Sequence, residues 1–368
     1  MPRLIASTCG ISVLRNGASR EDQALLNRCA NRKAPLPSDD WPAALDQLAM
    51  QAAATMNGAP ASVAASASAE LNGIITYYGE RWPREARQDT HVLLHTDTHL
   101  GAGAAEIVKD YLERAGVHAS LQRLAGLTTA SSAAFEAGMQ EAVLWCQEAD
   151  RDQRRHGVRV VYNLSGGFKS WLGYMSALGM LYADELVYIF EDSKALIRIP
   201  RLPLAIDDAV VAKDFALLRR MDIAPVPADD AAAARESLVT VHEGMASLSF
   251  LGAVLVEASR RRVYPSRLLE SPHPLLRFGP HLANAVRQWQ GQRQMEDINR
   301  RVDDLAQCLA SGGHNNPRRL DLKPLQGNPC PPSTHEFDLW SDGAAWRGFG
   351  HYADQVFIID QMGPPLHH

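Results

Sequence analysis

Short apolar runs alternate with longer stretches of helical periodicity over the first 200 residues of the chain. In one such stretch, 103–115, Ala104, Ile107, Val108 and Leu112 recur at helical spacing. Strands are predicted at 3–8, 91–96, 117–123, 156–163, 185–191 and 195–200. Helices are predicted at 41–72, 103–115, 131–150 and from the glycine pair at 166 to Tyr182. The alternation indicates a doubly wound α/β domain, Rossmann-like, over 1–205, with the last two strands forming a hairpin at the edge of an otherwise parallel sheet.

The pattern changes after the proline-bounded segment 198–206. Residues 206–279 are predicted to be a mostly helical connector with a loop at 223–230. Residues 280–368 are predicted to form an α+β domain. Its expected elements are one or two helices in 281–311, a helix end and turn at 316–327, and strands at 335–342, 344–352 and 355–363 joined by Asp-Gly and Asp-Gln turns.

Composition narrows the class of protein. With 368 residues, 46% hydrophobic and 21% charged, the chain can build sizeable globular cores. Its net charge of −5 argues against binding nucleic acid through overall charge, so any RNA would be held by local patches or by a larger assembly. The five cysteines show no CxxC spacing, and we expect neither a metal site nor a cofactor.

Membrane and export signals are not found in the sequence. No apolar run reaches the roughly 18 residues that a membrane span needs. The first ten residues lack the apolar region of a signal peptide. We therefore expect a cytoplasmic protein without a membrane partner.

Three predicted strand-to-helix loops are rich in glycine and hydroxyl residues: 7–16, 96–103 and 163–170. The carboxyl ends of parallel strands gather ligands, and glycines let backbone N–H groups approach a phosphate at a helix start. The spacing matches neither a P-loop nor the GxGxxG fingerprint. Each loop alone could be a structural turn, and Ser12 or Thr98 alone a helix cap.

The three loops also resemble a known family. The runs STCGISVLRN, TDTHLGAG and NLSGGFK resemble the strand-end loops of CARF domains of the CRISPR ring-nuclease type, over about residues 4–204. Ile11 departs from that pattern, because the family often has Thr there. The residues implied to bind ligand are Thr8, Gly10, Ser12, Asn16, Thr96, Asp97, Thr98, Asn163, Ser165, Gly166, Gly167 and Lys169.

The CARF resemblance implies a homodimer whose two loop faces enclose one cyclic oligoadenylate, with cyclic tetra-adenylate as the expected ring. Some relatives also cut this ring with its own 2′-hydroxyl. Lys169 would then stabilise the developing phosphate charge, and Ser12 would position the ring.

Residues 280–368 resemble the RelE family of ribosome-dependent mRNA endonucleases, most closely in the turn LKPLQG and the strand DGAAWR. The resemblance implies a metal-independent reaction in which Arg347 stabilises the phosphate charge and His351 and His367 act as general acid or base. Lys323 and Arg319, with Arg318, would contact the RNA backbone. The alternatives are a salt bridge for Arg347, a plain exposed histidine for His351, a purification-tag remnant for His367 and His368, and core packing for Trp340 and Trp346.

Together the two resemblances predict a CARF–RelE effector of type III CRISPR immunity. Cyclic oligoadenylate would bind the sensor dimer, and the RelE-like domains would then cut mRNA on the ribosome and arrest translation. One alternative is a stand-alone ring nuclease that degrades cyclic tetra-adenylate. Another is a ligand-responsive transcription regulator, for which Arg260–Arg262 is the only short basic cluster.

Overall fold

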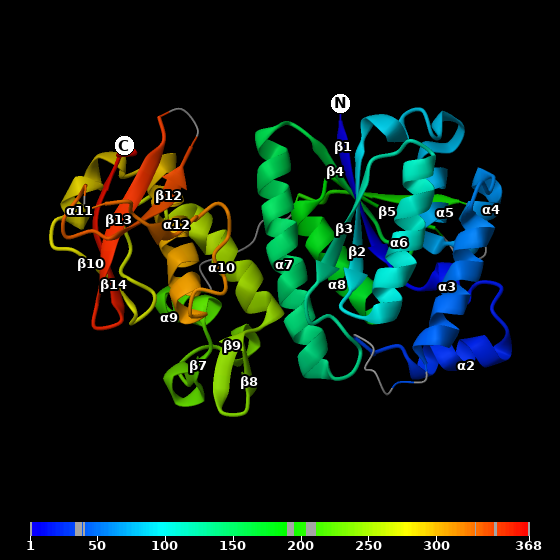
Figure 1. Cartoon of the computed structure of the whole chain (residues 1–368), viewed down its shortest axis with the longest axis horizontal. Coiled ribbons are helices and arrows are strands. Elements are labelled where there is room, and N and C mark those ends of the chain that lie inside the picture. Colours follow the sequence, from blue (N-terminus) through cyan, green and yellow to red (C-terminus); the bar gives the residue numbers. More distant parts are fainter. Residues whose placement is uncertain are drawn as a thin grey trace. The chain divides into compact units, whose positions relative to one another are not determined.

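The computed structural model describes residues 2–33, 39, 41–189, 195–203, 211–327, 329–341 and 344–366. The chain folds into two compact units, Met1–Ala205 and Ile206–His368 (Figure 1). Residues 206–279 and 280–368, expected as a connector and a separate domain, share the second unit. No helix in the described part of the chain is both long and apolar enough to cross a membrane.

The first unit is built on a six-stranded sheet of order β3-β2-β1-β4-β5-β6. Its first five strands are parallel and β6 is antiparallel, which confirms the parallel sheet and its hairpin edge. The strands are β1 (Arg3–Cys9), β2 (Thr90–Thr96), β3 (Ala119–Leu124), β4 (Arg159–Asn163), β5 (Glu185–Ile189) and β6 (Leu196–Pro200). The turn expected at 192–194 lies outside the described residues. Successive connections run in opposite directions from β1, so the β1/β4 boundary is a topological switch point.

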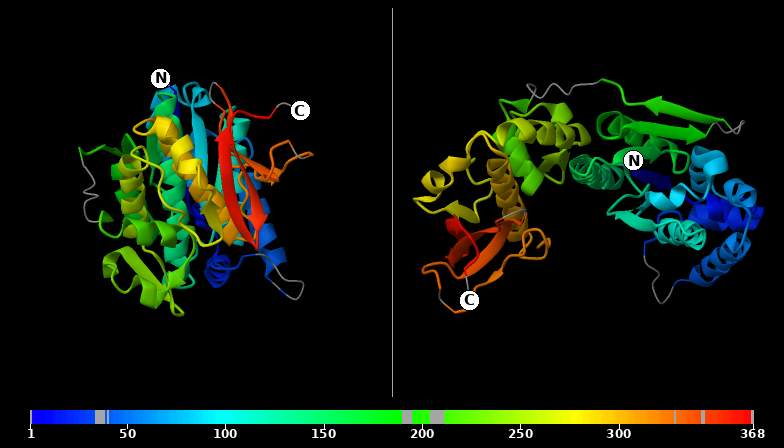
Figure 2. Two further views of the ribbon diagram at one scale, coloured as in Figure 1. Left: turned by 90° about the vertical axis from the view of Figure 1, so that its left-hand side faces the viewer. Right: turned by 90° about the horizontal axis from the view of Figure 1, so that it is seen from above.

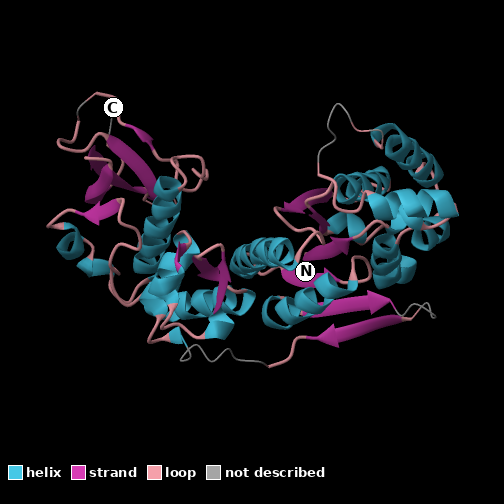
Figure 3. Ribbon diagram, turned by 90° about the horizontal axis from the view of Figure 1, so that it is seen from below, coloured by secondary structure: helices cyan, strands magenta, loops and turns pink. Residues whose placement is uncertain are grey.

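Helices cover both faces of this sheet (Figure 3). α5 and α6 pack on one face and share a core with α3, while α7 and α8 pack on the other face. The helices of the unit are α1 (Ser12–Arg15), α2 (Arg20–Arg28), α3 (Pro42–Met56), α4 (Ala61–Ala67), α5 (Ala69–Tyr78), α6 (His99–Arg114), α7 (Ser132–Arg155) and α8 (Lys169–Tyr182).

The single helix expected over 41–72 is wrong, because the chain forms α3, α4 and α5 there. Gly58 has a φ of +71° and Pro60 follows it, which ends α3 and starts α4. Ser68 then caps α5 by accepting a hydrogen bond from the Leu71 N–H at 3.2 Å. The Ala-rich composition favours helix but does not show these two breaks.

The second unit begins with a subdomain that the sequence did not predict. α9 (Phe215–Ile223) and α10 (Phe250–Val263) flank a three-stranded sheet of order β7-β9-β8. Its strands are β7 (Val226–Pro227), β8 (Val239–His242) and β9 (Met245–Leu248). The mostly helical connector expected at 206–279 is therefore wrong in its middle part. Glu243 and Gly244 both have positive φ, of 50° and 76°, so they form the tight turn between β8 and β9.

The C-terminal residues fold as a five-stranded sheet of order β10-β14-β13-β12-β11, beside α12 (Figure 2). The elements are β10 (Leu276–Phe278), α11 (Leu282–Ala285), α12 (Arg293–Ala310), β11 (Lys323–Pro324), β12 (His335–Trp340), β13 (Trp346–Ala353) and β14 (Val356–Gly363). The three predicted strands and the Asp354–Gln355 turn, with φ of 47° and 69°, are confirmed. The helix end expected at 316–327 is wrong, because turns and β11 occupy it. The other predicted turn, at 342–343, lies outside the described residues.

The tryptophans of this sheet belong to its packing. Trp340 and Trp346 are cross-strand partners whose rings stack with centroids 5.7 Å apart. Trp289 packs edge-on against both, at 5.6 and 4.6 Å. All three pack against the core of the second unit, which confirms the core alternative for Trp340 and Trp346.

Candidate functional site

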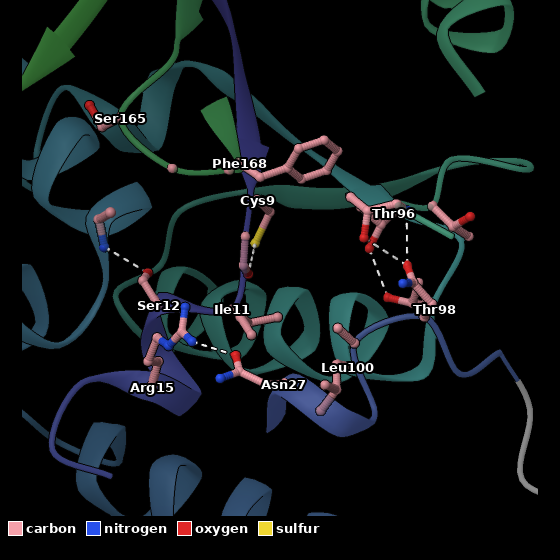
Figure 4. A pocket seen from close by; sticks show the side chains of 18 residues that line it. Cys9, Ile11, Ser12, Arg15, Asn27, Thr96, Thr98, Leu100, Ser165 and Phe168 are labelled. Atoms are coloured by element: carbon pink, nitrogen blue, oxygen red, sulfur yellow. Dashed lines mark hydrogen bonds between the residues drawn. The ribbon is translucent and has the colours of Figure 1, made fainter. Parts of the chain in front are cut away.

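A cavity of about 440 Å³ lies at the carboxyl ends of β1, β2 and β4 (Figure 4). Each of the three predicted loops contributes to its wall. The residues that were predicted to bind ligand and do line the cavity are Gly10, Ser12, Thr96, Thr98, Ser165, Gly166 and Gly167. The topology thus brings together segments more than 150 positions apart, at the switch point where α/β sheets bind ligands.

The first and third loops are held together by Glu70, a fully buried residue of α5. Its Oε1 accepts a hydrogen bond from the Gly10 N–H at 2.7 Å. Its Oε2 accepts from the hydroxyls of Ser12 and Ser68, also at 2.7 Å. The Gly10 N–H and the Ser12 hydroxyl are therefore already engaged within the protein. Both act here as positioning groups that fix the loop after β1.

Gly166 is required by this close packing. A Cβ at Gly166 would lie 2.0 Å from Glu70 Oε1, and a Cβ at Gly10 would lie 2.9 Å from the Gly167 nitrogen. Gly167 has a φ of +110°, which L side chains rarely adopt. The glycine pair thus lets the loop before α8 lie directly against Glu70.

Three backbone N–H groups of the cavity wall, just before α8, have no acceptor among the described residues. The N–H groups of Gly166, Gly167 and Phe168 donate to no atom of a described residue. All three residues line the cavity and directly precede Lys169, the first residue of α8. A run of free N–H groups at the positive end of a helix is suited to anionic oxygens.

The hydroxyls of the second loop are partly used within the loop. Thr98 caps α6 by accepting from the Gly101 N–H at 3.0 Å, which confirms the helix-cap alternative. Thr96 and Thr98 share a hydrogen bond of 2.8 Å between their hydroxyl oxygens. Ser165 Oγ accepts from the Ile189 N–H at 3.2 Å. These groups give the cavity a polar wall of fixed geometry.

Several predicted ligand residues lie outside the cavity wall. Thr8 and Asn163 are fully buried, where Thr8 donates to the Gly166 carbonyl at 2.5 Å and Asn163 donates to Ser7 Oγ at 3.1 Å. Asn16 donates to the carbonyl of Ala67 at 3.1 Å. These three side chains hold the loops through hydrogen bonds outside the cavity wall.

Asp97 and Lys169 differ from that group because they carry charge. Asp97 forms ion pairs with Lys33 at 2.9 Å and Arg123 at 3.3 Å, so its carboxylate is neutralised. Lys169 is exposed at the first turn of α8, next to Phe168 of the cavity wall. Neither residue lines the cavity.

The cavity also has walls that the sequence did not indicate. Arg15 is the one cation among its described lining residues, and its Nη2 donates to Asn27 Oδ1 at 2.5 Å (Figure 4). Asn31 Oδ1 accepts from the Thr129 N–H at 2.8 Å, and the Phe168 ring forms another part of the wall. Arg15 falls within the first predicted loop, whereas Asn27, Asn31 and Thr129 lie in segments that showed no motif.

The catalytic candidates of the C-terminal sheet are paired with carboxylates. Arg347 Nη1 donates to Glu336 Oε1 at 2.6 Å, and its Nε lies 3.3 Å from Asp338. The hydrogen bond to Glu336 is the main cause that raises the pKa of Arg347. Lys323 pairs with Asp321 and lies 3.8 Å from Glu336. Burial raises the pKa of Asp338 even with Arg347 beside it.

The remaining candidates follow the same pattern. Arg319 donates to both oxygens of Asp304 at 3.0 Å. His351 Nδ1 lies 2.9 Å from Asp360 Oδ2, which also accepts from Ser333 at 2.7 Å. His367 lies outside the described residues. Carboxylates therefore orient each described candidate, and the salt-bridge alternative for Arg347 is confirmed.

Part of the first unit matches a known protein family. Residues 65–202 match a family described as CRISPR-associated protein (Cas_APE2256). The match begins before α5, which carries Glu70, and runs through β2 to β6, so it includes the second and third loops of the cavity. No curated protein matches the chain. The match supports a CRISPR-associated protein.

Proposed function

We propose that the first unit is a sensor for cyclic oligoadenylate, with cyclic tetra-adenylate as the expected ring. The observation that carries the proposal is a run of N–H groups, from Gly166 to Phe168, that donate to no described residue and belong to the wall of a cavity at the switch point of a parallel sheet. Phosphate oxygens of the ring would accept from these groups, and Arg15 would add a positive charge. The match to a CRISPR-associated family supports this class of signal.

The size of the cavity favours a dimeric sensor. A volume of about 440 Å³ is at the small end for ligand sites and would hold part of a ring of several nucleotides. Two copies of the chain related by a two-fold axis would each contribute one cavity to a symmetric ring. We therefore propose a homodimer that binds one ring between its two loop faces.

The second unit is proposed to be the effector, a ribosome-dependent mRNA endoribonuclease of the RelE type. The order of a helical segment followed by the antiparallel strands β12, β13 and β14 supports this proposal. Arg347 and His351 are four positions apart on β13, hence on one face and separated by roughly 13 Å along the strand. RNA phosphate would have to displace Glu336 and Asp338 from Arg347, which is compatible with low activity in the absence of signal.

The experiment that tests the effector is mRNA cleavage on purified ribosomes, with and without cyclic tetra-adenylate. Cleavage is expected to require both ribosome and ligand. Arg347→Ala is expected to lower the rate by 10²-fold or more, roughly what loss of one charge-stabilising group costs. Arg277→Ala, which removes an exposed arginine of β10, is the matched control and should leave the rate unchanged. Equal cleavage of naked RNA would refute ribosome dependence, and an Arg347→Ala protein with full activity would refute the assigned role.

Cleavage of the ring itself is the second candidate function. It is favoured by Lys169, which is exposed beside the free N–H groups and forms no ion pair with a described residue. Incubation of the protein with labelled cyclic tetra-adenylate should yield linear products that are lost in Lys169→Ala. A ring that stays intact for hours with the unsubstituted protein would exclude this activity and leave sensing as the role of the first unit.

A further inference from the structure

A second cavity, of about 900 Å³, lies within the second unit. Its wall comes from α9, the C-terminal half of α10 and the segment 267–272. It shares no lining residue with the C-terminal sheet among the described residues. Glu270 is the one acidic residue among the described lining residues of this cavity. Five of these lining residues are cationic: Lys213, Arg219, Arg220, Arg262 and Arg267.

Three of these cations are exposed and form no ion pair with any described residue. No carboxylate of a described residue lies within ion-pair distance of Lys213, Arg220 or Arg267. In contrast, the described basic candidates of the sheet, such as Arg347, are neutralised by acids. Unpaired cations around one concave surface repel each other and raise its positive potential, which a bound polyanion would offset. In a chain with a net charge of −5, such a concentration is a marked local exception.

The inner wall of the cavity is built from buried polar groups. Arg219 is 4% exposed, and its Nε donates to Asp303 at 2.8 Å while its Nη1 donates to the Glu270 carbonyl at 2.7 Å. Ser259 also lines the cavity and is fully buried, and its hydroxyl has no hydrogen-bond partner among the described residues. Buried hydroxyls without a partner are uncommon, so Ser259 is a candidate to bond a ligand in this cavity.

We propose that this cavity binds the phosphate backbone of a single-stranded RNA. The inference rests on the proposed function only in taking RNA as the substrate of the second unit. Exposed cations on long side chains make charge contacts that are independent of base identity, which is how proteins hold a nucleic-acid backbone. Specific sites for small molecules are lined mainly by apolar groups, and this wall carries five cations. The cavity would thus hold the strand outside the sheet where it is cut.

The test measures binding without cleavage. The full-length protein is titrated into a fluorescent single-stranded RNA whose 2′-hydroxyls are all methylated, and anisotropy is followed over a range of salt concentrations. Arg220→Gln combined with Arg267→Gln should remove two contacts to RNA phosphates. Each contact contributes about 0.7 to the slope of log K, the RNA-binding constant, against log salt concentration for single strands, so the slope should become less steep by about 1.4. The matched control combines Arg235→Gln with Arg287→Gln, two exposed arginines outside the cavity, and should bind like the unsubstituted protein.

An unchanged salt dependence in the cavity variant, or an equal loss in the control, would overturn the proposal. Adding ATP or inorganic phosphate to the RNA-bound protein tests whether the cavity prefers a small phosphate ligand to an RNA backbone. If either displaces the RNA at one molecule per chain, the cavity takes a small phosphate ligand and the assignment to RNA fails. Cleavage on ribosomes is measured in parallel. Weaker RNA binding by the cavity variants supports the cavity whatever the rate of cutting. RNA binding by an unsubstituted protein that shows no cleavage refutes the proposed function alone.

Discussion

Single residues decide how the ligand cavity is built. Glu70 holds the loops at Gly10 and Gly166 from a position about 60 to 100 residues away in the sequence. The sequence identified the glycines and Ser12, because small and hydroxyl residues after a strand follow a local pattern. It could not identify Glu70, because a single acidic residue near the start of a helix is common. Only the tertiary fold brings Glu70 within hydrogen-bond distance of Gly10 and Ser12.

Substitution of Gly166 tests whether Glu70 holds these loops in place. In Gly166→Ala the new methyl group would overlap the buried carboxylate of Glu70, so the bonds to Gly10 and Ser12 must break. We expect a loss of about 1–3 kcal/mol in the free energy of unfolding of the first unit. We also expect ligand affinity to fall. Urea unfolding followed by circular dichroism measures the first effect.

Gly173→Ala is the control for this substitution. Gly173 is exposed within α8, and an added Cβ would meet no atom within 4 Å. Replacing an exposed helical glycine by alanine should stabilise the protein by roughly 0.5–1 kcal/mol. Equal stability of the two variants would contradict the role assigned to Gly166.

We expect His91 to make the stability of the first unit sensitive to acid. The imidazole is fully buried in β2, with its Nε2 3.2 Å from the Tyr78 hydroxyl, and burial lowers the pKa of His91 to about 3. In the unfolded chain the pKa is about 6.5. The unfolded state therefore takes up a proton between these values while the folded state does not, and stability falls as the pH decreases from about 6.5 towards 3.

Replacement of His91 should remove this acid sensitivity. Between pH 7 and pH 5 the histidine accounts for a loss of about 2 kcal/mol in the free energy of unfolding. We expect His91→Phe to lose less stability than the unsubstituted protein over that range, measured by urea unfolding at each pH. His118→Gln, at an exposed histidine, should keep the original dependence. Parallel pH profiles for the unsubstituted protein and His91→Phe would exclude this explanation.

At the scale of elements, α9, α10 and α12 are joined by a buried cluster of charges. Asp303 of α12 accepts from Arg219 of α9 at 2.8 Å and from Arg260 of α10 at 3.1 Å, and the Tyr264 hydroxyl also donates to it. Arg300 of α12 pairs with both oxygens of Glu257 at 2.8 and 3.0 Å. Arg260 is buried among these charges and is not available to bind DNA. The transcription-regulator alternative relied on the basic run Arg260–Arg262, which therefore loses one of its three residues.

Loss of one partner from this cluster should be severe. Asp303→Ala would leave the buried guanidinium of Arg219 without its carboxylate, whereas Arg260 would keep Asp222 at 2.6 Å. We expect the second unit to lose about 3–5 kcal/mol in the free energy of unfolding. Asp297→Ala breaks a more exposed pair with Arg293 on the same helix and should cost about 0–1 kcal/mol. Differential scanning calorimetry of both variants measures the difference. Similar melting temperatures for the two would show that the cluster does not hold the helices together.

Elements with clear periodicity were predictable, and short ones were not. Four of the parallel strands, β1, β2, β4 and β5, contain short apolar runs, and β12 to β14 are bounded by turn residues, so both sets follow from the sequence. β7, β8 and β9 have only two to four residues each, too few to show a period, and they are held by pairing with each other and by the Glu243–Gly244 turn. Tertiary contacts, rather than local propensity, determine that small sheet.

For the molecule as a whole, we propose that the first unit receives a nucleotide signal. The sequence predicted the three loops because each follows a strand. It missed the wall formed by Asn27, Asn31 and Thr129, because those residues reach the cavity only through the folding of α2 and of the segment after β3. The catalytic candidates of the second unit were chosen from a family resemblance, and their pairing with acids could not be seen in the sequence because it depends on strand register.

The most direct test is calorimetric titration of the full-length chain with cyclic tetra-adenylate. We expect saturable binding of one ring per two chains, with affinity lowered at least roughly tenfold by Gly166→Ala and unchanged in Gly173→Ala, since 1.4 kcal/mol of lost contacts is a tenfold effect. Absence of binding by the unsubstituted protein, or equal binding by both glycine variants, would contradict it.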